Sequence, residues 1–212
     1  MLVAGIRNIF LAKYKCGDYN GASLLEIVGA SFEADEDAIF GNVSSEYVCK
    51  EIEWYNTQEL NLNAMEPPVP KAWQSTACPQ GYVNSNYGWC IYSKDNGYQY
   101  LNVLRKLQAN IYTKRACMIY TRPTMHTDAV ANCKNDFICT NAVTYSVANN
   151  KLNCVVQMRS NDAVYGYKND LAWQKHVLAQ LAKDLGIEVG KIIWQAASLH
   201  IYKTHFKLLR NN

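Results

Sequence analysis

The 212-residue chain contains no run of five or six like charges, and its 21 basic side chains nearly balance its 18 acidic ones. The net charge is therefore only +3. A nucleic-acid surface needs a larger or more concentrated basic field, so we expect no nucleic-acid partner. A few arginines directed at one phosphate are still compatible with this balance, because such a contact needs only local charge.

Long apolar runs are also lacking, and no stretch approaches the roughly 18 residues of a membrane-spanning helix. Near the start of the chain, Leu2, Ile6 and Phe10 follow a helical spacing, and Arg7 interrupts any apolar signal core. We therefore expect an amphipathic helix at the N-terminus, no membrane association and a cytoplasmic location.

The eight cysteines include no Cys-x-x-Cys pair, and their spacing is not that of a disulfide framework. With no export signal, we expect reduced thiols. A zinc site made of His126, Cys133 and Cys139 is an alternative, but its spacing fits no common zinc pattern, so we expect no metal. The cysteines are Cys16, Cys49, Cys78, Cys90, Cys117, Cys133, Cys139 and Cys154.

The length and the hydrophobic content of 49% suffice for one core, so we expect a single domain over residues 1–212. In the first part of the chain, branched and aromatic residues at 24–32 predict a strand, and apolar spacing at 46–55 and 98–108 predicts helices. Three prolines within residues 64–70 predict an irregular loop, and a strand is expected to begin at Arg115.

The second part of the chain predicts a strand pair joined by Asn149 and Asn150, which tolerate the positive φ of a tight turn. Asp170 is a plausible N-cap for a helix that stops at Gly186. Two short strands, at 191–195 and 198–202, are expected to follow. Because helices and strands mix without strict alternation, the fold class is α+β.

The chemistry-bearing residues follow one another in a particular order. Cys139 enters a strand, the run Arg-Ser-Asn-Asp begins twenty residues later at Arg159, Gly166 and Asp170 follow, and His-x-Tyr begins at His200. This order and spacing resemble the thymidylate synthase family. The resemblance implies that family's mixed sheet packed with helices and a homodimer formed through the sheet.

The resemblance extends upstream to about Glu26, through KEIEWY around Glu51, KAWQ around Trp73, SNYGW around Tyr87 and the pair Lys114-Arg115. Within the family, several segments look most like the sequences of the bacteriophage deoxycytidylate hydroxymethylases. These segments are IVGASF, EIEWY, IYTRP, DFICTN and MRSNDAVYGYKNDLAWQK.

The resemblance implies that Cys139 is the nucleophile. Carbon-5 of a pyrimidine reacts poorly until a nucleophile adds to carbon-6, and a thiolate does this well. Taken alone, a cysteine is more often a small buried hydrophobe. By the same resemblance, Arg159 and Ser160 bind the nucleotide 5′-phosphate, with Lys114 and Arg115 contributed by the partner subunit.

Asp170 stands where thymidylate synthases carry an asparagine that reads uracil. Cytosine presents a bare ring nitrogen and an amino donor, the inverse of uracil's pattern. A carboxylate accepts from the amino group, and a proton shared with the ring nitrogen completes the pair. We therefore expect Asp170 to favour cytosine. A helix cap alone would not explain the aspartate, because asparagine caps as well.

The remaining assignments also rest on the resemblance. Glu51 is expected to take part in proton transfers near the base, whereas Glu53 is expected to be a solvated helix residue. Tyr87 is expected to be a phenol near the nucleophile. Trp73 and Asp162 are expected to contact the folate, and His200 with Tyr202 the sugar 3′-hydroxyl.

The implied reaction is transfer of a one-carbon unit from 5,10-methylene-tetrahydrofolate to deoxycytidylate, followed by addition of water to give a 5-hydroxymethyl product used in DNA modification. Alternatives are a thymidylate synthase, a (deoxy)cytidylate methylase and a non-catalytic nucleotide-binding relative. Three departures accompany the resemblance: Tyr19 replaces an expected basic residue, Thr140 replaces a histidine, and the chain ends at Asn212, soon after His-x-Tyr.

Overall fold

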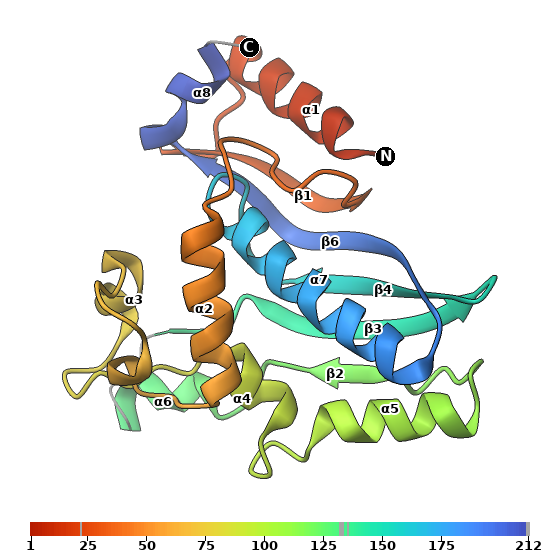
Figure 1. The fold of residues 1–212 in the computed structure, drawn as a ribbon. Coiled ribbons are helices and arrows are strands. Elements are labelled where there is room, and N and C mark those ends of the chain that lie inside the picture. Colours follow the sequence, from red (N-terminus) through yellow and green to blue (C-terminus); the bar gives the residue numbers. More distant parts are fainter. Residues whose placement is uncertain (22, 132–133, 135, 211–212) are drawn as a thin grey trace. The chain divides into compact units, whose positions relative to one another are not determined.

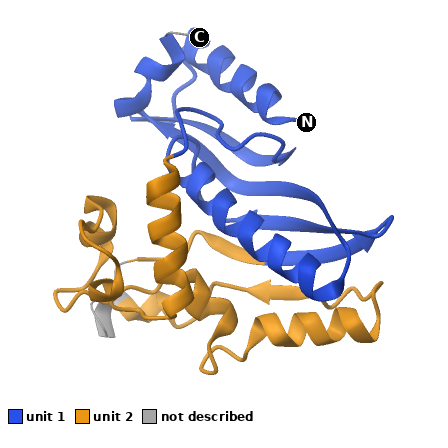
Figure 2. Cartoon of the chain, viewed as in Figure 1, with its two compact units in different colours: residues 1–43, 143–212 blue, residues 44–142 orange. Residues whose placement is uncertain are grey.

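The computed structural model describes residues 1–21, 23–131, 134 and 136–210. The chain divides into two compact units, which Figure 2 shows in different colours. Unit 1 consists of Met1–Val43 and Val143–Asn212, and unit 2 of Ser44–Ala142. That all 212 residues act as one catalytic domain stays a prediction.

Within its described residues, unit 1 contains a sheet and four helices (Figure 1). Its helices are α1 (Val3–Cys16), α7 (Gly166–Leu185), α8 (Lys207–Arg210) and the 3-10 helix η2 (Lys203–His205); its strands are β1 (Leu24–Glu33), β4 (Lys151–Met158), β5 (Asn161–Asp162), β6 (Glu188–Tyr202) and most of β3 (Thr140–Ala148).

Unit 2 is mainly helical and holds the start of β3. Its elements are α2 (Ser45–Thr57), η1 (Leu62–Ala64), α3 (Lys71–Thr76), α4 (Tyr87–Tyr92), α5 (Gln99–Ala109), β2 (Cys117–Ile119) and α6 (Met125–Ala131). The predicted helices at 46–55 and 98–108 are confirmed as α2 and α5. The strand expected from Arg115 is confirmed, but only as the three residues of β2.

Strand β6 is the centre of the sheet in unit 1. It pairs antiparallel with β1 and parallel with both β4 and β5. The prediction of two short strands here was wrong, because β6 is one continuous strand of 15 residues. Ala196, in the middle of β6, pairs with β1 on one side and β4 on the other, so the chain stays extended through this point.

The predicted hairpin between β3 and β4 is confirmed. Asn149 and Asn150 both adopt positive φ, 51° and 58°. These values are those of a two-residue turn whose twist matches its strands.

Helix α7 packs against β4 and β6 within unit 1 (Figure 1). Its predicted end is confirmed, since Gly186 is left-handed with φ 68°. The prediction that Asp170 caps its start was wrong, because the helix begins at Gly166. Asp162 instead accepts the backbone N–H groups of Val164 and Tyr165 just before the helix, so the chain is turned into α7 well ahead of Asp170.

Within unit 2, α4 approaches α2 closely at Gly88. A Cβ atom at Gly88 would lie 1.7 Å from the backbone carbonyl oxygen of Tyr55. Backbone atoms cannot move aside as a flexible side chain can, so only glycine allows this approach. The contact places Tyr87 beside α2.

Replacing Gly88 with alanine therefore tests this approach. We expect Gly88→Ala to lower the free energy of unfolding by about 3 kcal/mol or more, since two helices must separate. Gly5→Ala is the matched control in helix α1, where the new Cβ meets only the exposed, flexible side chain of Met1. It should be neutral or stabilising by up to about 1 kcal/mol. Equal urea midpoints for the two variants would contradict this account.

Candidate active site

Cys139 lies in unit 2, half-buried, directly before β3. The next residue, Thr140, is fully buried and donates its hydroxyl hydrogen to the phenolic oxygen of Tyr87 at 3.1 Å. Thr140 is the residue that departs from the family's histidine. Its side chain links the start of β3, the strand that follows Cys139, to the phenol. That Tyr87 acts beside the nucleophile stays a prediction.

Tyr87 is held by aromatic contacts and is only 4% exposed. Its ring stacks on that of Tyr55, with ring centroids 5.2 Å apart, and meets the ring of Tyr120 edge-on at 5.2 Å. Rings packed on two sides leave little rotational freedom. The hydroxyl therefore has a fixed position.

Glu51 projects from α2 into a buried setting and is 5% exposed. It accepts hydrogen bonds from the Tyr47 hydroxyl at 2.6 Å and from the Trp73 indole N–H at 3.1 Å. Burial raises the pKa of Glu51 to about 7, and the hydrogen bonds from Tyr47, Trp73 and Tyr55 only partly oppose this rise. A carboxyl group with such a pKa can exchange a proton near neutral pH.

Trp73 differs in part from what the sequence suggested. Its indole N–H is shared between Glu51 and the Tyr47 hydroxyl, both at 3.1 Å, and its ring meets Trp54 edge-on with centroids 5.0 Å apart. Trp73 therefore orients the carboxyl of Glu51, a role that sequence reasoning missed. Its contact with folate stays a prediction. Glu53 is exposed, as expected.

A buried carboxylate supports this part of the site. Asp136 accepts the backbone N–H groups of Asn84 and Ser85 at 2.7 Å, and burial raises the pKa of Asp136. It thereby joins the segment before Cys139 to the segment before Tyr87. Both segments belong to motifs noted in the sequence, DFICTN and SNYGW, but nothing in the local sequence indicates that they bond to each other.

The second group of predicted residues lies in unit 1, around β6. Arg159 and Ser160 follow the end of β4 and are half-buried. The next two residues form β5, whose parallel register pairs Asp162 with His200. This pairing explains the spacing between the Arg-Ser-Asn-Asp and His-x-Tyr motifs, because it places them on adjacent strands.

Asp170 lies in the second turn of α7, half-buried. Its Oδ2 accepts a hydrogen bond of 2.9 Å from the side-chain amide of Asn161, and the oxygen of that amide accepts one of 3.2 Å from the indole N–H of Trp194. Sequence reasoning missed both partners. Asn161 belongs to the Arg-Ser-Asn-Asp motif and Trp194 to an expected strand, and neither pattern indicates a bond to the other.

His200 is 6% exposed, and its Nδ1 lies 3.3 Å from the hydroxyl oxygen of Ser198. That hydroxyl donates to Glu26 on β1, and the hydrogen bonds from Ser198 and Asn20 lower the pKa of Glu26. Tyr202 is exposed, and its ring meets that of His200 edge-on at 4.9 Å. The two predicted sugar-binding residues are thus neighbours.

Three further predicted residues are Asp162, Lys114 and Arg115. The carboxylate oxygens of Asp162 accept backbone N–H groups before α7, at 3.0 and 3.3 Å, so this residue has a structural role besides its predicted contact with the pterin. Lys114 and Arg115 are exposed in the segment before β2. Their reach into a partner subunit stays a prediction.

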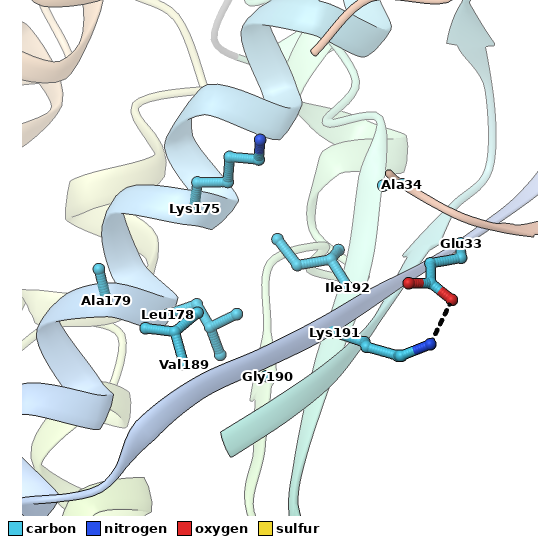
Figure 3. A pocket seen from close by; sticks show the side chains of 9 residues that line it. All are labelled: Glu33, Ala34, Lys175, Leu178, Ala179, Val189, Gly190, Lys191 and Ile192. Atoms are coloured by element: carbon cyan, nitrogen blue, oxygen red, sulfur yellow. Dashed lines mark hydrogen bonds and ion pairs between the residues drawn. The ribbon is translucent and has the colours of Figure 1, made fainter. Parts of the chain in front are cut away.

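A groove of about 380 Å³ on unit 1 contains none of the predicted residues. Figure 3 shows Lys191 paired with Glu33 at its edge, at 2.8 Å. Lys175, which also lines the groove, pairs with Asp37. Because both lysines are paired with carboxylates, the groove does not have the features of a phosphate site.

Neither a metal cluster nor a membrane helix is found in the described part of the chain. Among the described residues, no three His, Cys, Asp or Glu side chains are placed to hold a metal ion. The zinc alternative also involves Cys133, which lies outside the described residues. Seven described cysteines are thiols. No described helix is long and apolar enough to cross a membrane.

Comparisons with known proteins found relatives of this chain. Residues 23–212 match the family model of thymidylate synthase. The chain is 46% identical over 199 residues to the deoxycytidylate 5-hydroxymethyltransferase of Enterobacteria phage T4, covering 91% of this chain and 81% of that protein. A thymidylate synthase of Francisella tularensis subsp. holarctica is 23% identical over 170 residues, with coverages of 76% and 62%.

Among solved structures, thermostable thymidylate synthase A from Bacillus subtilis matches with a TM-score of 0.74 and 18% identity, covering 97% of this chain and 82% of that one. At this identity the match concerns the fold. It confirms the predicted α+β class and the thymidylate-synthase-like architecture.

The raised pKa of Glu51 makes stability depend on pH. The unfolded carboxyl ionises near its ordinary value of 4.5 and the folded one near 7, so the free energy of unfolding falls as pH rises between these values. Glu51→Gln removes this loss while its amide oxygen can still accept from Tyr47 and Trp73. We compare the free energy of unfolding of the variant with that of wild type. We expect this difference to be about 3 kcal/mol more favourable to the variant at pH 8 than at pH 4.

Urea unfolding at both pH values measures this difference. Glu53→Gln, at an exposed position on the same helix, is the control and should show no such pH dependence. A Glu51→Gln effect that is the same at pH 4 and pH 8 would show that the buried carboxyl does not titrate in this range.

Proposed function

Since the chain belongs to the thymidylate synthase family, we propose that it transfers a one-carbon unit from 5,10-methylene-tetrahydrofolate to carbon-5 of deoxycytidylate. The product is 5-hydroxymethyl-deoxycytidylate, made in the cytoplasm as a precursor for modified DNA. The setting of Asp170 carries this proposal. Its carboxylate does not cap the helix and accepts a hydrogen bond from Asn161. From the resemblance to the family, we infer that this carboxylate reads the base.

Cys139 begins the proposed reaction. Its thiolate adds to carbon-6 of cytosine, which makes carbon-5 nucleophilic, and the same bond breaks when the product leaves. Methylene-tetrahydrofolate would supply the carbon to carbon-5, and the bonds from this carbon to the folate nitrogens break as tetrahydrofolate leaves. The Tyr87 hydroxyl, bonded to Thr140 beside the cysteine, is placed to assist removal of the carbon-5 proton.

Glu51 serves the proton transfers of the proposed reaction. With a pKa of about 7, it is present in both protonation states at neutral pH. It can therefore give a proton to the base or take one from the water that adds to the exocyclic carbon. Trp73 and Tyr47 keep the carboxyl in one orientation through their hydrogen bonds.

Asp170 selects the base in this proposal. The carboxylate accepts from the amino group of cytosine, and a proton shared with the ring nitrogen completes the pair. With uracil, an ionised carboxylate would face the 4-carbonyl oxygen, which also only accepts. A site that leaves such groups unpaired rejects the wrong base strongly.

The phosphate and the sugar are assigned to other residues of unit 1. Arg159 and Ser160 bind the 5′-phosphate by charge-assisted hydrogen bonds. Ser198 donates its only hydroxyl hydrogen to Glu26, so it accepts from His200 Nδ1–H. This fixes the histidine tautomer and leaves Nε2 to accept a hydrogen bond from the 3′-hydroxyl, beside Tyr202.

Two residues fit the folate substrate. Trp73 is half-buried beside Glu51 and uses its N–H for that carboxyl, so its ring face is the part suited to a flat pterin. Each Asp162 oxygen accepts one backbone hydrogen bond and keeps a second lone pair, which suits the N–H groups of a pterin.

Release of tritium from carbon-5 of labelled deoxycytidylate and deoxyuridylate, with methylene-tetrahydrofolate present, tests the function. We expect release that favours deoxycytidylate and that Cys139→Ala reduces by about 1,000-fold or more. Asp170→Asn combined with Asn161→Leu should shift the preference toward deoxyuridylate by about 100-fold, because an amide that Asn161 no longer orients can turn to match uracil.

Two other results would each favour a different function. Production of dihydrofolate would indicate hydride transfer, as in a thymidylate synthase or a methylase. No release from either nucleotide, with nucleotide binding intact, would indicate a non-catalytic relative.

We also propose a homodimer in which Lys114 and Arg115 act on the phosphate bound by the partner subunit. A variant lacking both basic side chains, Lys114→Ala with Arg115→Ala, should be inactive alone, as should Cys139→Ala. Mixed and refolded together in equal amounts, they should regain roughly a quarter of wild-type activity, because half of the dimers carry one intact site. Two inactive variants that stay inactive when mixed, although they form dimers, would show that each subunit uses its own basic pair.

A further inference from the structure

A donor-and-acceptor chain in unit 1 ends at the residue proposed to read the base. The indole N–H of Trp194 donates to Asn161 Oδ1 at 3.2 Å, and Asn161 Nδ2 donates to Asp170 Oδ2 at 2.9 Å. Trp194 is 0% exposed and Asn161 is 2% exposed. Water therefore does not compete for these bonds, and their loss would leave buried polar groups without partners.

The hydrogen bonds from Trp194 to Asn161 to Asp170 can run in only one direction. An indole N–H can donate but cannot accept, so it requires the oxygen of the Asn161 amide to face it. The NH2 group then has to face Asp170. An NH2 group only donates, so Asp170 Oδ2 has to accept. Trp194 thus decides the orientation of the amide, and the amide decides which carboxyl oxygen of Asp170 is the acceptor.

Gly166 leaves the space that this contact needs. A Cβ atom there would lie 3.1 Å from Asn161 Nδ2 and 3.6 Å from Asp170 Oδ2. The first distance is tighter than normal packing allows. The glycine in the motif therefore has a steric reason that is independent of backbone flexibility.

The direction of these hydrogen bonds matters because a protonated carboxyl group can pair with either pyrimidine. With its O–H toward the ring nitrogen and its carbonyl oxygen toward the amino group, it fits cytosine. Turned over, its carbonyl oxygen accepts the ring N–H of uracil and its O–H donates to the 4-carbonyl oxygen. Aspartate at position 170 is therefore not sufficient for selection, since an unrestrained carboxyl group can offer both patterns.

We propose that Asn161, oriented by Trp194, is a positioning residue that locks Asp170 into the pattern for cytosine. Because Oδ2 accepts from Asn161, the shared proton stays on Oδ1 and faces the ring nitrogen of the base. This inference rests on the proposed function, since it assumes that Asp170 pairs with the base. It adds that selection against uracil resides in a buried chain that does not itself touch the substrate.

The test compares kcat/KM for deoxycytidylate and deoxyuridylate by tritium release. Asn161→Leu keeps a similar volume and removes the donor. Trp194→Phe removes the indole N–H that orients the amide, together with part of a buried ring. In both variants we expect the ratio of the two values to fall at least about tenfold, with kcat/KM for deoxyuridylate rising. A merely structural defect would lower both values together and leave the ratio unchanged.

Trp173→Phe is the matched control, because Trp173 is a buried tryptophan of α7 that stacks on His176 and is not part of the chain. It should leave the ratio at the wild-type value. Combining Trp194→Phe with Asn161→Leu should give the ratio of Asn161→Leu alone, because both changes break one chain. If Asn161→Leu fails to fold, as judged by circular dichroism, Trp194→Phe gives the same information.

The outcomes separate this inference from the proposed function. A wild-type preference for deoxycytidylate that survives in Asn161→Leu and Trp194→Phe would overturn the role of the chain and leave the function intact. If wild type releases tritium from neither nucleotide, the proposed function fails. The ratio of dissociation constants for the two nucleotides, measured by calorimetry, then decides the role of Asn161, which is supported by a tenfold fall in the variants and overturned by an unchanged ratio.

Discussion

The pairing of β6 on both of its sides is the constraint on which the site in unit 1 depends. Strand β1 holds one edge of β6 antiparallel, and β4 and β5 hold the other edge parallel. This register sets the positions of three side chains that act on neighbours: Trp194 toward Asn161, Ser198 toward Glu26, and His200 beside Asp162. A slip of one residue would turn all three to the opposite face of the sheet.

Unit 2 depends on a different principle, the burial of polar groups among aromatic rings. Glu51 keeps a raised pKa because it is buried, and it tolerates burial because Tyr47, Tyr55 and Trp73 supply hydrogen bonds. The ring of Tyr55 also stacks on Tyr87 and so links the carboxyl to the phenol that accepts a hydrogen bond from Thr140. Removing one ring would therefore disturb both Glu51 and Tyr87.

The sequence predicted those features that depend on neighbouring residues. The Asn149-Asn150 turn and the helix end at Gly186 follow from backbone preferences at single positions, and both are confirmed. The start of α7 was predicted wrongly because aspartate is a common N-cap residue, which favoured Asp170. Asp162, eight residues earlier, is the aspartate that accepts backbone N–H groups just before the helix.

For the site, the motifs named residues but not their partners. Asn161 and Trp194 are 33 residues apart, and Thr140 and Tyr87 are 53 apart. Their contacts arise from sheet register and helix packing, which local patterns do not specify. The continuity of β6 was missed for a related reason, because its pairing with two neighbouring strands keeps it extended.

In the proposed reaction, one carbon and the oxygen of water are added to the cytosine of deoxycytidylate. Mass spectrometry of the nucleotide made in water enriched in heavy oxygen, together with identification of the folate product, tests it most directly. The account predicts a deoxycytidylate carrying one added CH2O group with the heavy oxygen in it, accompanied by tetrahydrofolate. A methylated nucleotide accompanied by dihydrofolate, or a product formed only from deoxyuridylate, would contradict it.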